Sequence, residues 1–369
     1  AATGNVTQAV PEDFPAEDAT RLRPRFVRET VEGLMKELAA YQFNDSLEPL
    51  VLLEEWTRKR LSMDDAVDDL EEGYLAVLQC PDISREARMF AAKQLSIVGG
   101  RKSIGTLAQL LYDEQAGGMA RFALERIPES AALTALREAL PKVGAEQRAG
   151  IISSLAARKD VRAVTVISAA IHDEDARVVA NALHALAALG TTEAAASLRI
   201  AMELKTGDAR ALAQDAWVHC GFSMLHARRT RDARALFEEA PALLADNPSA
   251  RAAAVRGRIA VAGRRGGDVI AEILQSDDVD MHPIAAAAVR DMADRRALRK
   301  AAELLPRLAP YAQTVLLTAL SETQAEDITA LLVEAAHSEA EEVRRAALEA
   351  IGRVGCADAA VFLAERAAV

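Results

Sequence analysis

The sequence contains few aromatic residues: phenylalanine, tyrosine and tryptophan together make up 4% of its 369 residues. It is 51% hydrophobic, with alanine the commonest apolar residue, so the chain can bury a core built from small side chains. Alternating β-branched runs between turns are nearly absent, which argues against a β-rich domain. No apolar run approaches the roughly 18 residues that a membrane-spanning helix needs. The composition therefore predicts closely packed helices and no membrane insertion.

Cysteine is also scarce. The three cysteines, Cys80, Cys220 and Cys356, are far apart in the sequence, and no two form a C-x-x-C motif. Their odd number and spacing argue against a disulfide framework and against a paired-cysteine metal site. The motifs of phosphate-binding loops, serine hydrolases and HExxH zinc enzymes are absent. We therefore expect no cofactor, no metal and no catalytic residue, and we expect that this chain alone is not an enzyme.

Basic charge is in deficit. The chain has 44 basic and 55 acidic residues, a net charge of −11 and a pI of about 5.2. An acidic balance disfavours nucleic acid as the partner. We expect instead a protein partner or an enzyme subunit, and neither a small-molecule ligand nor a sequence-specific nucleic-acid target. The start, AATGNVTQAV, has no methionine and no basic segment, so it fits either an exported protein after signal cleavage or a shortened form.

What the sequence does contain is a repeat. In VRRAALEAIGRVG (343–355), apolar residues follow Arg344 at offsets of 3, 4, 7 and 10, and a glycine follows at 11. These offsets make one apolar stripe on a helix with a glycine stop. Full or looser matches begin near residues 88, 121, 148, 179, 210, 252, 284, 313 and 344.

The mean spacing of these starts is about 32 residues, and most steps contain a second apolar helix. Six second helices are expected, at 103–113, 163–173, 194–204, 268–276, 327–338 and 358–367. One such hairpin cannot hide its own apolar face. The sequence therefore predicts an all-α fold in which helical hairpins stack into an α-solenoid.

Two segments, SEAEEVRRAALEAIGRVG and PDISREARMFAAKQLSIVGG, resemble HEAT repeats, and the resemblance extends over roughly residues 82–369. It implies an armadillo-like solenoid and, most often, a scaffold function. Iron-binding HEAT hydroxylases use His-Glu pairs, but no histidine here precedes a glutamate. HEAT-type DNA glycosylases need a basic groove with aromatic residues, which this composition does not favour.

The longest step, from 210 to 252, departs from the HEAT pattern. Its segment AWVHCGFSMLHARRTRDARALFEEAPALLADNP resembles a tetratricopeptide unit, and Pro248 closes it. With SREARMFAAKQLSIVGG and GGMARFALERIPES, it makes the chain similar to HEAT-array proteins of planctomycete–verrucomicrobial bacteria. Those proteins are commonly exported, so we expect a periplasmic or secreted location, with the cytoplasm as the alternative.

These patterns divide the chain into five parts. We expect an extended arm at 1–20, an N-terminal helical cap at 21–81, HEAT-like repeats at 82–205, a tetratricopeptide-like pair at 206–247, and HEAT-like repeats at 248–369. The cap is the block that a solenoid needs over its first apolar face.

The stretch AWVHCG (216–221) places a tryptophan, a histidine and a cysteine together. Adjacent helical residues diverge by about 100°, so His219 and Cys220 face different directions. Trp217 and Cys220 occupy the repeat's core offsets, and Gly221 occupies the offset of the stop. We interpret the stretch as core packing with a helix end, because free cysteine is a common small core residue.

The acidic run MDDAVDDLEEG places Asp64, Asp68 and Glu72 on one helical face. A calcium site needs a looped cage of oxygen ligands with a turn glycine, so a solvated helix face is the favoured interpretation. Near the repeat starts, Arg210 has Asp208 beside it and Arg344 has Glu341. We expect such pairs to tie adjacent repeats together.

Pairs of basic residues follow the first helix in five repeats, at 101–102, 158–159, 228–229, 264–265 and 295–296. Cations at helix C-termini complement the helix dipole, which is the structural interpretation. The alternative is a basic strip along one edge that binds an anionic polymer, a phosphate or an acidic partner. Its candidate binding residues are Arg228, Arg229, Arg264, Arg265, Arg295 and Arg296.

Two functions are consistent with these features. The first is a scaffold that presents an extended solenoid surface to a partner protein. The second is an accessory or substrate-binding module of an exported enzyme complex, whose basic turn edge contacts an anionic ligand. The ending AERAAV has little polar capping, which favours a stack that continues in the natural polypeptide or in a second subunit.

Overall fold

The computed structural model describes residues 30–63, 66–290, 295–323 and 328–354, with only the backbone described for 295–298. Every regular element in these ranges is a helix, which confirms the predicted all-α class. The chain divides into two compact units, Ala1–Val143 and Gly144–Val369, which are described separately. No helix in the described ranges combines the length and apolar character needed to cross a membrane.

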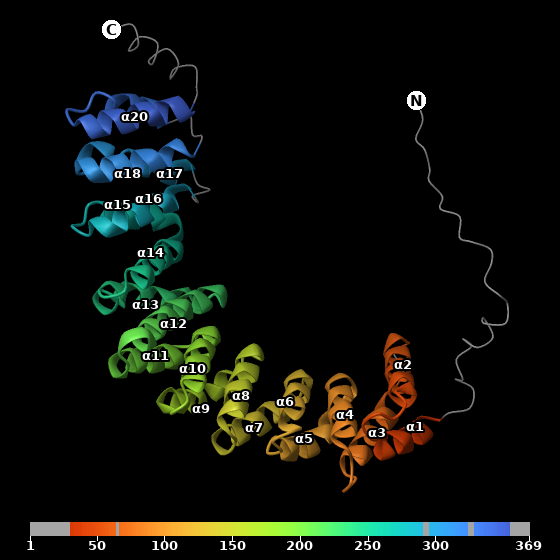
Figure 1. The fold of residues 1–369 in the computed structure, drawn as a ribbon. Coiled ribbons are helices and arrows are strands. Elements are labelled where there is room, and N and C mark those ends of the chain that lie inside the picture. The colour runs from red at the N-terminus through yellow and green to blue at the C-terminus, as the bar shows by residue number, and fades with distance from the viewer. Residues whose placement is uncertain (1–29, 64–65, 291–294, 324–327, 355–369) are drawn as a thin grey trace, which may run out of the picture. The chain divides into compact units, whose positions relative to one another are not determined.

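The first unit begins with three helices and continues as helical hairpins. Helix α3 packs on α4, α4 packs on α6, and α5 packs on both α6 and α7. Figure 1 shows α4 and α6 standing side by side. Its elements are α1 (Val31–Ala40), α2 (Glu48–Ser62), α3 (Asp68–Leu78), α4 (Arg85–Val98), η1 (Arg101–Ser103), α5 (Ile104–Leu110), α6 (Gly117–Arg126), α7 (Ser130–Ala139) and η2 (Leu140–Lys142).

The second unit is a longer stack of the same kind. The first half of its elements are α8 (Ala145–Ala157), η3 (Val161–Ala163), α9 (Val164–Ala169), η4 (Ala170–His172), α10 (Ala176–Leu189), α11 (Thr192–Leu204), α12 (Gly207–His226) and α13 (Thr230–Leu243). The rest are α14 (Pro248–Ala262), η5 (Gly263–Arg265), α15 (Gly266–Leu274), η6 (Val279–Met281), α16 (His282–Arg290), α17 (Arg295–Ala302), η7 (Leu305–Arg307), α18 (Pro310–Ser321), α19 (Thr329–Ala335) and α20 (Glu341–Val354).

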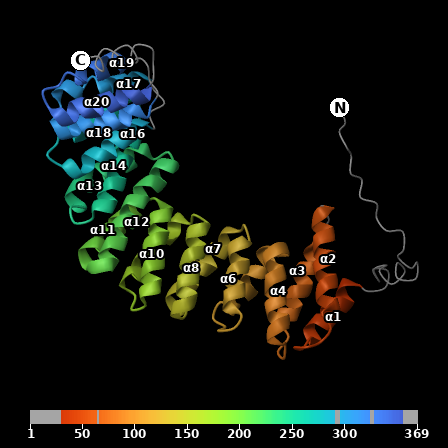
Figure 2. The same cartoon turned by 45° about the horizontal axis from the view of Figure 1, so that its top comes forward.

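The even-numbered helices of this unit form one continuous row, because each packs on the next from α8 to α20. Figure 2 shows α8, α10 and α12 following one another in this row. Each of the nine predicted repeat starts lies in an even-numbered helix between α4 and α20. Five of the six expected second helices overlap a helix, and the sixth, 358–367, lies outside the described residues. The predicted α-solenoid of stacked hairpins is therefore the observed fold.

The core lies where the repeat offsets predict it. In α4, the side chains of Ala91, Ala92, Leu95 and Val98 are all buried. Small alanines at these offsets let neighbouring helices approach closely, which agrees with the low aromatic content.

A recurring arginine–aspartate pair fastens the hairpins. Arg88 pairs with Asp113 at 3.0 Å and Arg148 with Asp173 at 2.9 Å, each joining a first helix to the loop after its second helix. Asp113 also accepts hydrogen bonds from the backbone N–H groups of Gln115 and Ala116, at the start of α6. The same carboxylate thus holds one hairpin to the next.

Two predicted pairings within this pattern are wrong. Arg210 pairs with Asp246 at 3.0 Å and donates to the carbonyl of Met202, and it is not paired with Asp208. Arg344 donates to the backbone carbonyls of Ser338 and Glu339. Asp246, Ser338 and Glu339 lie in loops between helices, and Met202 lies in the last turn of α11, so these arginines bind groups on the preceding or following segment and not the nearby acids of their own helix.

In the repeat that departs from the HEAT-like pattern, formed by α12 and α13, the helices pack around one aromatic ring. Phe237 on α13 is fully buried and packs edge-to-face on Phe222, with ring centroids 5.2 Å apart. A Cβ atom added at Gly257 on α14 would lie 2.4 Å from this ring, and one added at Gly221 on α12 would lie 2.7 Å from it. The two glycines therefore make room for Phe237 between three helices.

This packing corrects the role predicted for Gly221. The residue lies inside α12, which continues to His226, and does not end the helix. The glycine is required by the close approach of α13 and not by a left-handed stop.

Candidate functional site

The stretch AWVHCG is part of the core, as predicted. Trp217 and Cys220 are buried, and the Cys220 thiol lies 3.8 Å from the carbonyl oxygen of Thr191. Burial raises the pKa of this thiol to about 12. His219 is exposed on another face of α12. A thiol that stays protonated at neutral pH, with no imidazole beside it, is not set up as a nucleophile.

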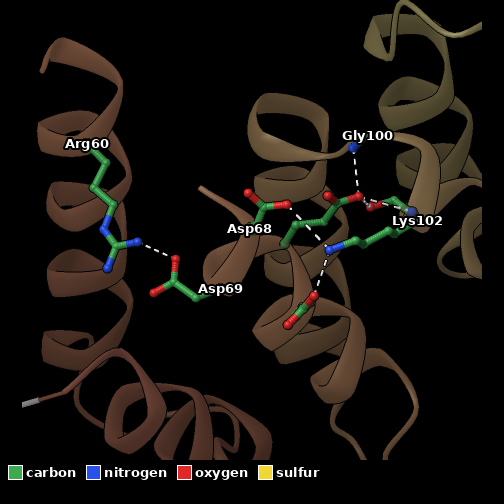
Figure 3. A network of polar contacts seen from close by, with 8 residues as sticks. Arg60, Asp68, Asp69, Gly100 and Lys102 are labelled. Atoms are coloured by element: carbon green, nitrogen blue, oxygen red, sulfur yellow. Dashed lines mark hydrogen bonds and ion pairs between the residues drawn. The ribbon is translucent and has the colours of Figure 1, made fainter. Parts of the chain in front are cut away.

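The acidic residues at the start of α3 form ion pairs with basic side chains of neighbouring elements. Lys102 pairs with Glu72 at 2.7 Å and with Asp68 at 3.4 Å, and Arg60 pairs with Asp69 (Figure 3). Asp64, the third residue of the predicted face, lies outside the described residues. These pairs link α3 to α2 and to the turn after α4.

Glu71 in the same run is buried and acts as a cap. Its Oε1 accepts hydrogen bonds from the Gly100 N–H at 2.7 Å, the Ser103 N–H at 3.1 Å and the Ser103 hydroxyl at 2.6 Å. It therefore satisfies donors that a helix start leaves without partners. Within the described ranges, no three histidine, cysteine or carboxylate residues are grouped to hold a metal ion. The acidic run joins two layers of the stack.

Two residues of the predicted basic pairs bind carbonyls at the end of a neighbouring helix. Arg229 donates from Nη1 to the carbonyl of Gly190 at 3.1 Å, and its Nε pairs with Asp232 at 3.0 Å. Lys159 donates to the carbonyl of Ala188 at 2.8 Å. Both carbonyls lie at the C-terminal end of α10, where a cation complements the helix dipole.

The other arginines of the predicted strip are placed differently. Arg228 is exposed in the turn after α12, and Arg264 and Arg265 are exposed side by side in η5. Arg295 and Arg296 begin α17, and their side chains are not described. The structure thus brings Arg264 and Arg265 together in one turn, and the strip as a whole stays a prediction.

A cleft opens on one face of α14, between the second helices α13 and α15. Helix α15 packs directly against α17, but α13 and α15 make little direct contact and both pack on α14. Two cavities lie in the resulting space, of about 230 and 210 Å³. We call this space the α13–α15 cleft.

The first cavity has a mainly apolar lining. Its walls include Pro241 of α13, Val255 of α14, Ile273 of α15 and Met281 of η6. Pro241 lies inside α13, where it has no N–H to donate to the preceding turn. The second cavity is more polar, and Arg265 of the predicted strip is among its lining residues.

An ion pair lies between the two cavities and lines both. The Nη2 of Arg258 on α14 donates to Oε1 of Glu272 on α15 at 2.8 Å. The Arg258 side chain is 19% exposed, whereas that of Glu272 is 64% exposed. A guanidinium held mostly out of water, beside an apolar cavity, is a group that can fix the orientation of a bound ligand.

Sequence reasoning missed Arg258 and Glu272. The available signal was the aberrant spacing of this repeat, together with arginines at 251 and 258, which lie two turns apart on one face of α14. The cleft itself depends on the gap between α13 and α15, which no local pattern encodes.

A second, more apolar groove of about 390 Å³ lies in the first unit, between α1 and α3. Met35, Ala39, Gly73 and Val77 line it, and its charged residues include Glu32 and Lys36, which pair with each other at 2.8 Å. Since this groove has no buried polar group that converges on its centre, the α13–α15 cleft is the stronger candidate site.

Comparisons with known proteins find structural likenesses at low TM-scores and no sequence match. No family model matches the chain, and no curated protein matches it. Among solved structures, the chain is similar to human deoxyhypusine hydroxylase in complex with glycerol, at 18% identity and a TM-score of 0.32, covering 69% of this chain and 96% of that one. It is also similar to an engineered protein, at 19% identity and a TM-score of 0.38, covering 88% and 98%.

These comparisons correct one prediction. From the missing motifs we expected that the chain is not an enzyme, yet deoxyhypusine hydroxylase is an enzyme by its name. The prediction is therefore withdrawn. With a TM-score of 0.32, the likeness transfers no activity to this chain. What holds is the coarser statement that the protein is an all-α stack of helical repeats.

Proposed function

We propose that this protein is a helical-repeat interaction module that holds a segment of a partner protein in the α13–α15 cleft. The observation that carries the proposal is the pair of cavities along one face of α14, bridged by Arg258 and Glu272. In a closed stack, the second helices of neighbouring repeats would cover this face. Here the apolar lining is left open for another chain.

The length of the cleft favours a peptide segment over a small ligand. Its lining on α14 runs from Arg251 to Ala262. At 1.5 Å per residue this stretch of helix rises about 16 Å, which about five residues of extended chain would span. Filling the apolar cavity with one large aliphatic side chain would contribute about 2 kcal/mol.

Site-specific photo-cross-linking in the native cell tests the proposal. A benzophenone amino acid placed at Val269, which lines the second cavity, should give a discrete adduct with one protein. The same amino acid at Tyr311, exposed on α18, should not give this adduct.

An occluding variant provides the control. Ser276→Trp places a large ring at the first cavity from an exposed position, and it should abolish the adduct. Thr318→Trp makes a similar change at an exposed position of α18 and should leave the adduct unchanged. An adduct that persists in Ser276→Trp, or that forms equally from position 311, would refute the proposal.

A further inference from the structure

We infer, on the basis of the proposed function, that the bound segment carries a carboxylate next to an apolar side chain, and that this carboxylate replaces Glu272 on Arg258. The ion pair is then an internal latch. It closes the boundary between the two cavities in the free protein and opens when an acidic peptide enters.

Arg258 has the capacity to make this exchange. Its guanidinium carries five N–H donors, and one hydrogen bond is made to Glu272. The same side chain lines both cavities. A carboxylate entering from either cavity can therefore bind the guanidinium before Glu272 leaves, so the largely buried cation is never left unpaired.

Glu272 is the partner that can leave. At 64% exposure its carboxylate is already largely hydrated, and an ion pair with one well-exposed partner contributes little net stability. Released from Arg258, the carboxylate turns into water at low cost. A peptide carboxylate that arrives with an apolar side chain gains the burial of that side chain in addition.

Arg251, the other arginine of the first cavity, does not have this role. It pairs with Asp278 at 2.8 Å, and Asp280 lies 3.8 Å away. This is the same kind of pair as Arg88 with Asp113 and Arg148 with Asp173, which fastens hairpins throughout the stack. Arg251 therefore has a structural role in the hairpin. The Arg258–Glu272 pair differs from these pairs, because it joins α14 to a residue within α15 and not to the loop after it.

The position of the apolar cavity determines which residue should lie next to the acidic residue of the bound peptide. Val255, Ile273 and Met281 line the cavity that borders Arg258. A leucine, methionine or phenylalanine side chain seated against them lies beside the residue whose carboxylate meets the guanidinium. We therefore expect the recognised sequence to pair an acidic residue with a large apolar residue.

Selection from a phage-displayed library of random peptides on the full chain tests the inference. Selected peptides should be enriched in Asp or Glu next to Leu, Met or Phe. With a selected peptide as the probe, Arg258→Gln should weaken binding about tenfold, because a charge-assisted hydrogen bond is lost. Glu272→Gln should strengthen binding about threefold, because the competing carboxylate is removed.

Matched variants separate these effects from a general change of charge. Arg256→Gln makes the same change at an exposed position of α14, and Glu303→Gln removes a carboxylate paired with Arg299 on the surface of α17. Both should leave the affinity unchanged.

The outcomes distinguish this inference from the proposed function. If Ser276→Trp blocks binding but Arg258→Gln and Glu272→Gln change nothing, the cleft binds peptides and the latch is refuted. If no peptide is selected, or if Ser276→Trp has no effect on those that are, both ideas fail. Selected peptides without acidic residues would also overturn the inference.

Discussion

At the scale of single residues, Phe237 shows how one aromatic ring can organise three helices in a chain with few aromatics. Its ring is fully buried and lies against Gly221 of α12 and Gly257 of α14. The contact is so close that a methyl group at either glycine would overlap the ring. The two glycines are therefore packing residues inside helices, where glycine is otherwise unfavourable.

Replacing Gly257 should expose this constraint. Gly257→Ala should lower the free energy of unfolding by about 1–3 kcal/mol, because the new methyl group forces Phe237 from its position. The matched control is Gly352→Ala in α20, where no atom of the described residues, apart from the helix's own backbone, lies within 4 Å of the added carbon. That variant should be as stable as the parent or gain about 0.5 kcal/mol from the better helix former. Urea unfolding measures both, and a Gly257→Ala protein of unchanged stability would contradict this packing.

The Cys220 thiol provides a second test. Burial raises its pKa from an ordinary 9.0 to about 12, partly opposed by Arg229. Between pH 9 and 12 the unfolded chain releases this proton and the folded chain keeps it, so folding stability should fall as the pH rises through that range.

Replacing the thiol should remove this dependence. Unfolding measured at several alkaline pH values should show a smaller loss of stability for Cys220→Ala than for the parent. In a Cys80→Ser, Cys356→Ser background, a thiol reagent should label Cys220 only after unfolding. Rapid labelling of the folded protein would show that the thiol is accessible.

Residue roles were predictable where they follow the repeat. The offsets placed Trp217 and Cys220 in the core because equivalent positions of other repeats are apolar. Gly221 was assigned the wrong role, because a helix stop and a close-packing glycine look identical in one sequence. Only the position of Phe237 in space distinguishes them.

At the scale of elements, the fold depends on how each hairpin is tied to the next. Asp173 illustrates the tie, since it accepts a hydrogen bond from the Asp175 N–H at 3.0 Å and pairs with Arg148 at 2.9 Å. These contacts hold the pKa of Asp173 below its usual value of 3.8, the backbone hydrogen bond being the larger cause. The stabilisation is therefore present above that pH and is lost as the pH falls through the lowered pKa.

Neutralising this carboxylate should weaken the stack locally. Asp173→Asn should cost about 1.5 kcal/mol at neutral pH, because a charge-assisted hydrogen bond to Arg148 is lost. It should also reduce the loss of stability on acidification below pH 3.8. The control is Glu32→Gln, whose pair with Lys36 is exposed on both sides and should contribute little. Equal effects of the two substitutions would show that the arginine–aspartate pairs are not the ties described.

The first helices of the repeats were predictable in place but not in their contacts. The nine repeat starts fell in nine first helices because each depends on a local apolar period. The partners of Arg210 and Arg344 were predicted wrongly, because the groups that bind these arginines lie at helix ends and in loops that only the stacked structure brings near. The α13–α15 cleft escaped prediction for the same reason, since it arises from two helices that make little direct contact.

At the scale of the whole molecule, a stack of repeats offers many surfaces, and in the proposed function one of them, the α13–α15 cleft, recognises the partner. The remaining hairpins position α13, α14 and α15 and bury one another's apolar faces. In a solenoid each repeat contacts mainly its neighbours. A ligand held on α14 should therefore slow local opening of the adjacent helices and leave distant repeats unaffected.

Recognition at the α13–α15 cleft can be tested by hydrogen–deuterium exchange of the full chain, with and without a peptide selected for binding. With the peptide bound, we expect slower exchange in residues 230–281, which carry the cleft, and unchanged exchange in α18 and α20 of the same unit. Protection that is strongest in α18 and α20, or on the turn edge at Arg228 and Arg264 without protection of α14, would contradict it.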